Sequence, residues 1–197
     1  MSEITTPRDA ASLLLLRRDA SGPAVLMGAR SAGHAFMPNR LVFPGGAVDA
    51  EDHTAPAAAE APAAVLDRLA RIGGAGLARA LTMAAARELE EETGLHLGQP
   101  PDLSGLGYLC RAVTPPSMRI RFDARFLVVD ATFCQGSLAG SGELEQLAWF
   151  GVAEALALDL AFPTRKVLER LLVWLDEDAA TRSGPVPTLL NREWLLE

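Results

Sequence analysis

The chain has 197 residues, of which 49% are hydrophobic and 22% are charged, and its formal net charge is −7. This composition is ordinary for a soluble globular chain with a sizeable core, and the negative charge excludes a global basic field that would draw the protein to nucleic acid or to anionic membranes. We therefore expect a small-molecule partner, with no nucleic acid and no membrane. A partner that carries phosphate would need a cation to screen the repulsion.

The first half of the chain predicts strands followed by an insertion. Two apolar runs flank the turn at 19–23 and predict a hairpin, and a third strand ends at the glycine pair Gly45 and Gly46. The Ala- and Pro-rich stretch 49–62 indicates a surface insertion. The three predicted strands are 11–16, 24–29 and 41–43.

Two helices are predicted after the insertion. Apolar residues at helical spacing predict a helix over 63–72, and a longer helix should run from about 77 to 93. Gly94 should end this second helix, because glycine readily takes the left-handed conformation at a helix terminus.

The second half predicts further strands and helices around a mixed sheet. The predicted strands are 106–113, 119–129 and 147–150, and the predicted helices are 152–158 and 164–179. A tail from Ser183 onward should pack through Leu189, Leu190, Trp194 and Leu195. We expect a single α/β domain over 1–197, with an insertion over about 53–80 and a C-terminal helix and tail over about 164–197.

Cysteine usage and the N-terminus indicate a compartment. Cys110 and Cys134 each lie in an apolar strand-like run and are interpreted as reduced core residues. No secretory signal is visible, and no run approaches the roughly 18 to 20 apolar residues that span a bilayer. We expect a cytoplasmic protein.

An acidic patch lies in the second long helix. Glu88, Glu91 and Glu92 stand at i, i+3 and i+4, so their carboxylates share one patch near the negative end of the helix dipole. Mg²⁺ prefers oxygen ligands and explains this arrangement, and Arg87 can orient or neutralise part of the charge. A solvated or partner-binding acidic face is the alternative, because Glu is a good helix former.

The residues around these glutamates resemble a known motif. Residues 87–95, Arg-Glu-Leu-Glu-Glu-Glu-Thr-Gly-Leu, are similar to the second half of the Nudix box, and residues 43–46 resemble its first glycine turn. Asp52 stands where the family has a glutamate, and a long insertion separates the two halves. If the halves meet in space, Gly46 and Glu88 should lie side by side.

Further segments are similar to one branch of the Nudix family, the coenzyme A diphosphatase-like enzymes, which also carry an insertion inside the box. The likeness extends over most of residues 11–175. The segments that carry it are Arg30-Ser31, Phe36-Met37-Pro38, residues 42–49, Thr114-Pro115 and residues 121–126.

The resemblance implies a Nudix-type α/β/α sandwich with a mixed sheet and an inserted helical segment within the box. It implies hydrolysis of a diphosphate linkage in a nucleoside diphosphate derivative, with Mg²⁺ or Mn²⁺ held by Glu88, Glu91 and Glu92. Coenzyme A or acyl-CoA is the first expectation for the substrate. The alternatives are pyrophosphatase activity on ADP-ribose, another nucleotide sugar or a dinucleotide, and a non-catalytic nucleotide-binding module.

A general base must lie near the metal-bound water. Glu143 and Glu145 stand in a predicted loop before a late strand and are candidates, with Glu91 as the alternative and Arg87 as a further catalytic candidate. Each loop acid could equally be a solvated side chain.

Substrate contacts are expected from arginines and from the glycine turn. Arginine grips phosphate well, and the candidates to contact substrate are Arg30, Phe36, Gly45, Gly46, Arg119 and Arg121. Arg119 and Arg121 alternate with Asp123 and Arg125 and could instead form a solvated, ion-paired face. The insertion could form a lid or a dimer contact, so a homodimer is a further expectation.

Overall fold

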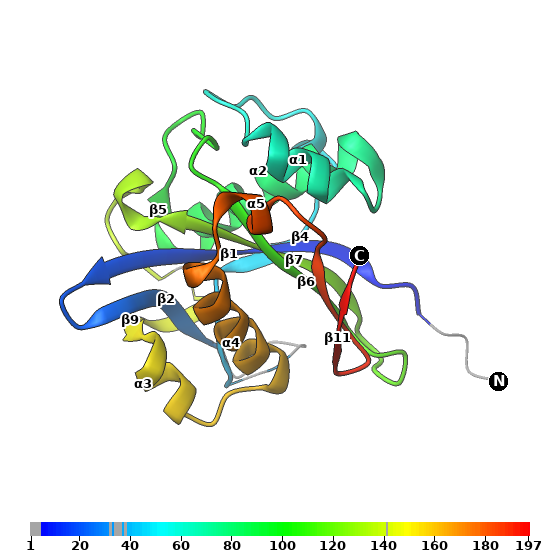
Figure 1. The fold of residues 1–197 in the computed structure, drawn as a ribbon. Helices are drawn as coiled ribbons and strands as arrows, with labels where there is room; N and C mark the ends of the chain where they lie inside the picture. The colour runs from blue at the N-terminus through cyan, green and yellow to red at the C-terminus, as the bar shows by residue number, and fades with distance from the viewer. Residues whose placement is uncertain (1–4, 32, 34–36, 38, 141) are drawn as a thin grey trace.

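A computed structural model describes residues 5–31, 33, 37, 39–140 and 142–197, and its centre is a mixed sheet with helices on both faces (Figure 1). The strands are β1 (Arg8–Asp19), β2 (Gly22–Arg30), β3 (Leu41–Val42), β4 (Gly45–Ala47), β5 (Leu95–His96), β6 (Gly107–Val113), β7 (Phe122–Asp130), β8 (Gln135–Gly136), β9 (Leu144–Gly151), β10 (Pro187–Leu190) and β11 (Glu193–Leu196). The α-helices are α1 (Ala63–Ala70), α2 (Gly74–Thr93), α3 (Val152–Ala157), α4 (Phe162–Asp176) and α5 (Ala179–Arg182). The expected α/β/α sandwich with a mixed sheet is confirmed.

The main sheet has the strand order β11-β10-β6-β7-β1-β2-β3, with β4 paired to β1 and β9 paired to β2. Two of its contacts, β1 with β7 and β10 with β6, are parallel, and the other pairs are antiparallel. The small second sheet joins β5 and β8. Among the described residues, no helix is long and apolar enough to cross a membrane.

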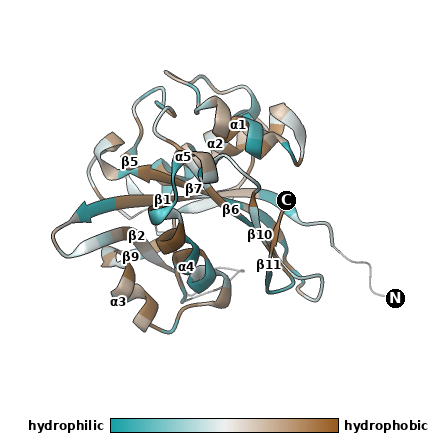
Figure 2. Cartoon of the chain, in the orientation of Figure 1, coloured by the Kyte–Doolittle hydropathy of each residue, from teal (hydrophilic) through white to brown (hydrophobic). Residues whose placement is uncertain are grey.

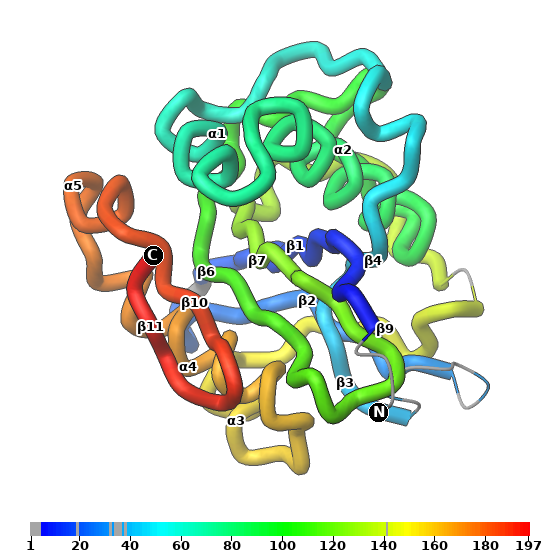
Figure 3. The backbone as a smooth tube through the Cα atoms, turned by 90° about the vertical axis from the view of Figure 1, so that its right-hand side faces the viewer, coloured from blue at the N-terminus to red at the C-terminus, as the bar shows by residue number. Residues whose placement is uncertain are grey.

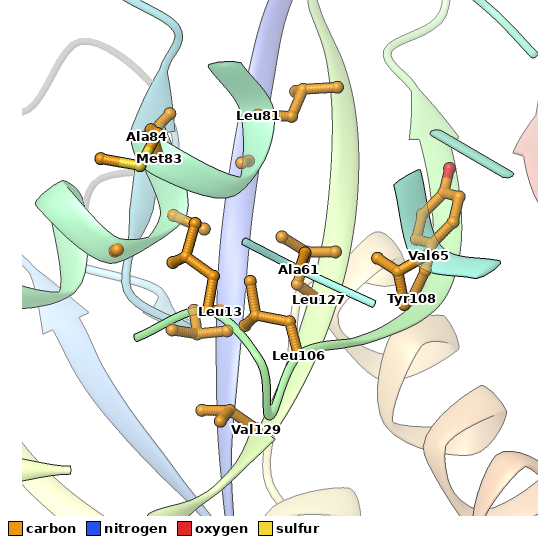
Figure 4. Close-up of a cluster of buried hydrophobic side chains, with 14 of the residues drawn as sticks. Leu13, Ala61, Val65, Leu81, Met83, Ala84, Leu106, Tyr108, Leu127 and Val129 are labelled. Atoms are coloured by element: carbon orange, nitrogen blue, oxygen red, sulfur yellow. The ribbon is translucent and has the colours of Figure 1, made fainter. Parts of the chain in front are cut away.

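Strand β1 divides the core because alternate side chains of a strand point to opposite faces. Leu13 and Leu15 pack in the layer beneath α1 and α2, whereas Leu14 and Leu16 pack in the layer against α3 and α4. Figure 4 shows part of the first layer, where Leu13 lies near Leu127 and the helix side chains. Apolar residues dominate the central strands (Figure 2).

Helix α2 packs closely on the sheet through small side chains. Ala80, Ala84 and Ala85 are fully buried, which lets the helix backbone approach β1. The helix ends as predicted: Gly94 has φ 72° and donates its N–H to the Glu90 carbonyl oxygen. It begins at Gly74, earlier than predicted, directly after the left-handed Gly73.

Part of the insertion reaches the core, so its prediction as a surface segment was wrong in part. Ala61 is 5% exposed and packs with α1 and α2, and Asp52 is 2% exposed. Backbone hydrogen bonds also join Ala58 to Pro101 and Leu103 to Ala59. Alanine gave no sign of this burial in the sequence, because it is common on surfaces and in cores alike.

Several predicted boundaries were wrong. Strand β3 ends before the glycine pair as predicted, but Gly45 and Gly46 then form β4, which pairs with β1, and this strand was not predicted. Strand β7 begins at Phe122, so Arg119 precedes it, and β9 begins at Leu144, so Glu145 lies in a strand. Cys134 follows a 3-10 helix at Ala131–Phe133. Both cysteines are free thiols.

The C-terminal tail is a hairpin of the main sheet. Strand β10 runs parallel to β6, and β11 folds back on β10 at the sheet edge (Figure 3). Leu189 is buried as expected, but Trp194 and Leu195 are 37% and 47% exposed, so their prediction as packed residues was wrong.

Candidate active site

The two halves of the acidic motif meet in space. Strand β4 pairs with β1, and α2 crosses beside it. A Cβ atom on Gly46 would overlap the Glu88 carboxylate, and the N–H of Gly45 donates to Glu92 Oε2 at 2.7 Å. The prediction that Gly46 and Glu88 lie side by side is confirmed, and a side chain at position 46 would displace the Glu88 carboxylate from this place.

Arg87 joins the glycine strand, the 3-10 turn at Glu51–His53 and α2. Its guanidinium donates to both Asp52 oxygens at 3.0 Å and to the carbonyl oxygen of Ala47 at 3.0 Å. It also contacts Glu88 Oε1 at 2.9 Å and Glu91 Oε2 at 3.0 Å. Asp52 therefore anchors Arg87 across the insertion, although it is shorter than the glutamate of the family pattern.

Replacing Asp52 with Asn should lower the free energy of unfolding by about 2–3 kcal/mol, because it breaks a buried, bidentate ion pair. The Asp52 side chain is 3% exposed. Urea denaturation measures the change. Asp49→Asn is the matched control, since Asp49 is 57% exposed and lies 3.6 Å from the same guanidinium. Equal losses in the two variants would contradict the anchoring role of Asp52.

The carboxylates of Glu88 and Glu92 are held away from water. Burial, reinforced by the charge of Glu88, raises the pKa of Glu92 to about 8, against the hydrogen bond from Gly45 and the charge of Arg30. Burial also raises the pKa of Glu88, while Arg87 opposes the rise. The charge of Glu143 raises the pKa of both groups. Desolvated carboxylates that repel one another form a site that a cation would stabilise.

Glu91 occupies a different position. Its side chain is 57% exposed and accepts a hydrogen bond from Arg87. In the part of the chain that the structure describes, no set of three or more His, Cys, Asp or Glu side chains is arranged to hold a metal ion. The oxygen donors of Glu88 and Glu92 suit a hard cation such as Mg²⁺, whereas Glu91 would have to leave Arg87 to join them.

The carboxylates of Glu88 and Glu92 line one end of a large cavity of about 980 Å³. Glu88, Glu92 and Glu143 lie there with Arg30 and the Gly45–Gly46 turn. Glu145 is absent from this lining and borders a shallower hollow, which is formed by Leu138, Gly140, Gly142 and residues 144–147. The structure thus brings Glu143, and not Glu145, to the same cavity as the helix glutamates.

The other substrate candidates lie elsewhere. Arg121 donates to the carbonyl oxygens of Thr114 and Thr5, and Arg119 is exposed. Neither lines the cavity. Phe36 falls outside the described residues. Trp149 packs against the core with the Arg17 guanidinium 4.8 Å from its ring centroid.

The charged segment around β7 forms ion pairs. Arg111 holds Asp123 through two hydrogen bonds of 2.7 Å, and Arg125, which is 2% exposed, contacts Asp9 and Asp123. The ion pairs of the alternative are therefore present for Asp123 and Arg125, but Arg125 is buried, so its prediction as part of a solvated face was wrong. The sequence did not reveal the apolar residues that make up most of the cavity wall, because they come from strands far apart in the chain.

Comparison with known proteins finds a NUDIX domain and a shared fold. Residues 74–171 match the NUDIX domain. A NUDIX hydrolase from Alicyclobacillus acidocaldarius is 24% identical, with 93% of this chain and 98% of that chain covered and a TM-score of 0.66. A MutT NUDIX hydrolase from Burkholderia pseudomallei is 21% identical, with 85% of this chain and 99% of that chain covered and a TM-score of 0.56.

The NUDIX domain of NrtR from Shewanella oneidensis, complexed with ADP ribose, is 17% identical, with 87% of this chain and 90% of that chain covered and a TM-score of 0.53. No curated protein sequence matches the chain. The matched domain contains α2 with its glutamates, and the solved structures share the fold around it. Residues 74–171 are therefore a NUDIX domain, and the chain has the fold of the Nudix hydrolases.

Proposed function

We propose that this protein uses Mg²⁺ or Mn²⁺ to hydrolyse the diphosphate bridge of a nucleoside diphosphate derivative, with Glu88 and Glu92 as the principal metal ligands. The observation that carries the proposal is the convergence of Glu88, Glu92 and Glu143 beside the Gly45–Gly46 turn at one end of the cavity. When bound, the cation would neutralise phosphate charge and make the attacking water more acidic.

The residues around the carboxylates have separate duties in this proposal. The Gly45–Gly46 turn brings backbone close to the carboxylates and fixes Glu92 through a hydrogen bond. Arg87 positions Glu88 and keeps Glu91 nearby as a further ligand or as a base. Arg30 lines the cavity and opposes the charge of Glu92, so it is suited to a phosphate oxygen.

Glu143 is the favoured general base. It lines the cavity, and its charge acts on both Glu88 and Glu92, whereas Glu145 borders another hollow. Glu143→Gln should lower kcat by about 10²–10⁴, the usual contribution of a general base, while Glu145→Gln should leave kcat within about twofold. Steady-state kinetics on the best substrate measure both. Near wild-type kcat in Glu143→Gln would move the role to Glu91.

A substrate panel tests the proposed activity itself. The protein is incubated with Mg²⁺ and with coenzyme A, an acyl-CoA, ADP-ribose, NADH or a dinucleoside polyphosphate, and the products are separated by chromatography. Coenzyme A or its acyl derivative is expected to be cleaved best, on the basis of the sequence resemblance. ADP-ribose is included because a NUDIX domain of the same fold is known in complex with it. Binding of panel members without cleavage of any would favour a nucleotide-binding module.

A further inference from the structure

The cavity extends far beyond the carboxylates. From Glu88 and Glu92 it continues across the sheet to the N-terminus of α4 and the turn between β10 and β11. Leu189, Asn191 and Arg192, which line its far end, follow the segment that matches the NUDIX domain. The far end is thus built in part by a segment of the chain outside the matched domain.

The strand register places four alanines next to one another beneath this space, and their small side chains leave it open. Ala10 pairs with Ala47 on β4 and with Ala124 on β7, and Ala124 pairs with Ala112 on β6. Ala112 in turn pairs with Leu189 on β10. All five residues line the cavity. They form one transverse row across the neighbouring strands β4, β1, β7, β6 and β10. Figure 3 shows these strands side by side. With strands about 4.8 Å apart, the row is about 19 Å long.

We call the part of the cavity that lies over this row of five residues the trough, and its walls are mainly apolar. Phe122 and Phe126 lie two positions to either side of Ala124 on β7 and face the same side of the sheet. Met118, Ile120 and Pro163 add further apolar lining. The floor consists of strands whose backbone groups are paired in the sheet. A group lying in the trough therefore meets mostly hydrocarbon, with Ser12, Thr114 and Thr164 among the polar side chains of the lining.

Three aromatic rings that line the cavity have ring contacts of their own. Phe43 and Phe126 meet edge to face with ring centroids 6.3 Å apart, and the Arg192 guanidinium lies 4.2 Å from the Phe162 ring centroid. Recognition of a nucleobase usually needs a free aromatic face or groups that hydrogen-bond its edge. An aliphatic chain needs neither, and its burial against alanine and phenylalanine is favourable.

We propose that the trough binds an aliphatic arm attached to the diphosphate, so that the substrate class is a nucleoside diphosphate esterified to a long apolar chain. This inference rests on the proposed function for the position of the diphosphate at the carboxylate end. In the reaction, water attacks one phosphorus, the bridging P–O bond breaks, and the bridging oxygen leaves with the other phosphate. An alkyl ester of ADP thus yields AMP and an alkyl phosphate.

The test uses the methyl, butyl and octyl β-esters of ADP with Mg²⁺. We expect kcat/KM to rise by at least about tenfold from the methyl to the octyl ester, because each buried methylene group favours binding. Equal values for the three esters would overturn the inference while leaving the hydrolase activity in place. If no ester is cleaved, the proposed function fails, and calorimetric affinities of the intact esters test the trough: an affinity independent of chain length overturns it.

Substitutions locate the arm. Ala124→Leu places a large side chain in the middle of the row and should reduce the octyl-to-methyl ratio of kcat/KM to about twofold or less. Ala112→Val is a smaller obstruction that serves if the first variant does not fold, and thermal melting checks both. Ala153→Leu is the matched control, since Ala153 is exposed on α3 and does not line the cavity. An unchanged ratio in a folded Ala124→Leu or Ala112→Val variant would overturn the proposal.

Discussion

Replacing Glu92 with Gln should reduce kcat by about 10²–10³ in saturating Mg²⁺, the range seen when one group that stabilises the transition state is removed. The substitution preserves shape, because the amide oxygen of Gln can still accept the hydrogen bond from Gly45 that Glu92 Oε2 accepts at 2.7 Å. It removes the negative charge that the cation needs. Steady-state kinetics on the best substrate measure the loss.

The same variant has a binding readout that does not depend on catalysis. Mg²⁺ should raise the melting temperature of the wild-type protein, because a ligand of the folded state stabilises it and because a cation relieves the repulsion between Glu88 and Glu92. Most of this rise should disappear in Glu92→Gln. A loss of kcat with an undiminished melting shift would place the metal on other ligands.

Glu90→Gln is the matched control for both measurements. Glu90 lies on the same helix, is exposed, and accepts a hydrogen bond from Gln99 at 2.6 Å. It does not line the cavity. We expect wild-type kcat and a wild-type Mg²⁺ shift from it. A comparable loss in Glu90→Gln would mean that charge on this helix acts generally, as in a solvated acidic face.

Local signals made α2 and its acidic patch predictable. Glutamates at i, i+3 and i+4 and a glycine after the last turn depend only on helix geometry, and both features are present as expected. The meeting of Gly46 with Glu88 also followed from the sequence, through the resemblance of two separated motifs. No periodicity within 43–95 predicted it, because the contact spans the whole insertion.

The strands that the sequence did not predict, β4, β10 and β11, form only by pairing with strands that are distant in the sequence or with one another. Strand β4 has three residues, two of them glycine, and becomes a strand only by pairing with β1. The C-terminal hairpin likewise needs β6 as its template. Short strands carry little intrinsic signal, because β-propensity reflects the surroundings of the residue.

The type of a single side chain was also a poor guide to its role. Arg121 has the side chain of a phosphate ligand but donates to backbone carbonyl oxygens at one end of the β6–β7 hairpin. The trough was invisible in the sequence for the opposite reason. Ala10, Ala112 and Ala124 are unremarkable residues until the register places them in one row.

Replacing Arg68 with Met should lower the free energy of unfolding by about 3 kcal/mol, because it leaves buried carbonyl oxygens without their charged donor. Arg68 is 5% exposed on α1 and donates to the carbonyl oxygens of Tyr108, Gly184 and Pro185 at 2.8, 3.1 and 3.4 Å. Burial lowers the pKa of Arg68, so the guanidinium carries a desolvation cost that its hydrogen bonds to the three carbonyl oxygens offset. Chemical denaturation measures the change in unfolding free energy.

Arg71→Met separates this effect from a general loss of charge on α1. Arg71 lies one turn later and also donates to Gly184, at 3.2 Å, but from an exposed position. Its replacement should change the unfolding free energy by no more than about 1 kcal/mol, as for other exposed polar contacts. Equal effects of the two substitutions would contradict a specific role for Arg68. Because Gly184 and Pro185 lead directly into β10, a large effect confined to Arg68 would show that the inserted helix holds in place the hairpin that closes the far end of the trough.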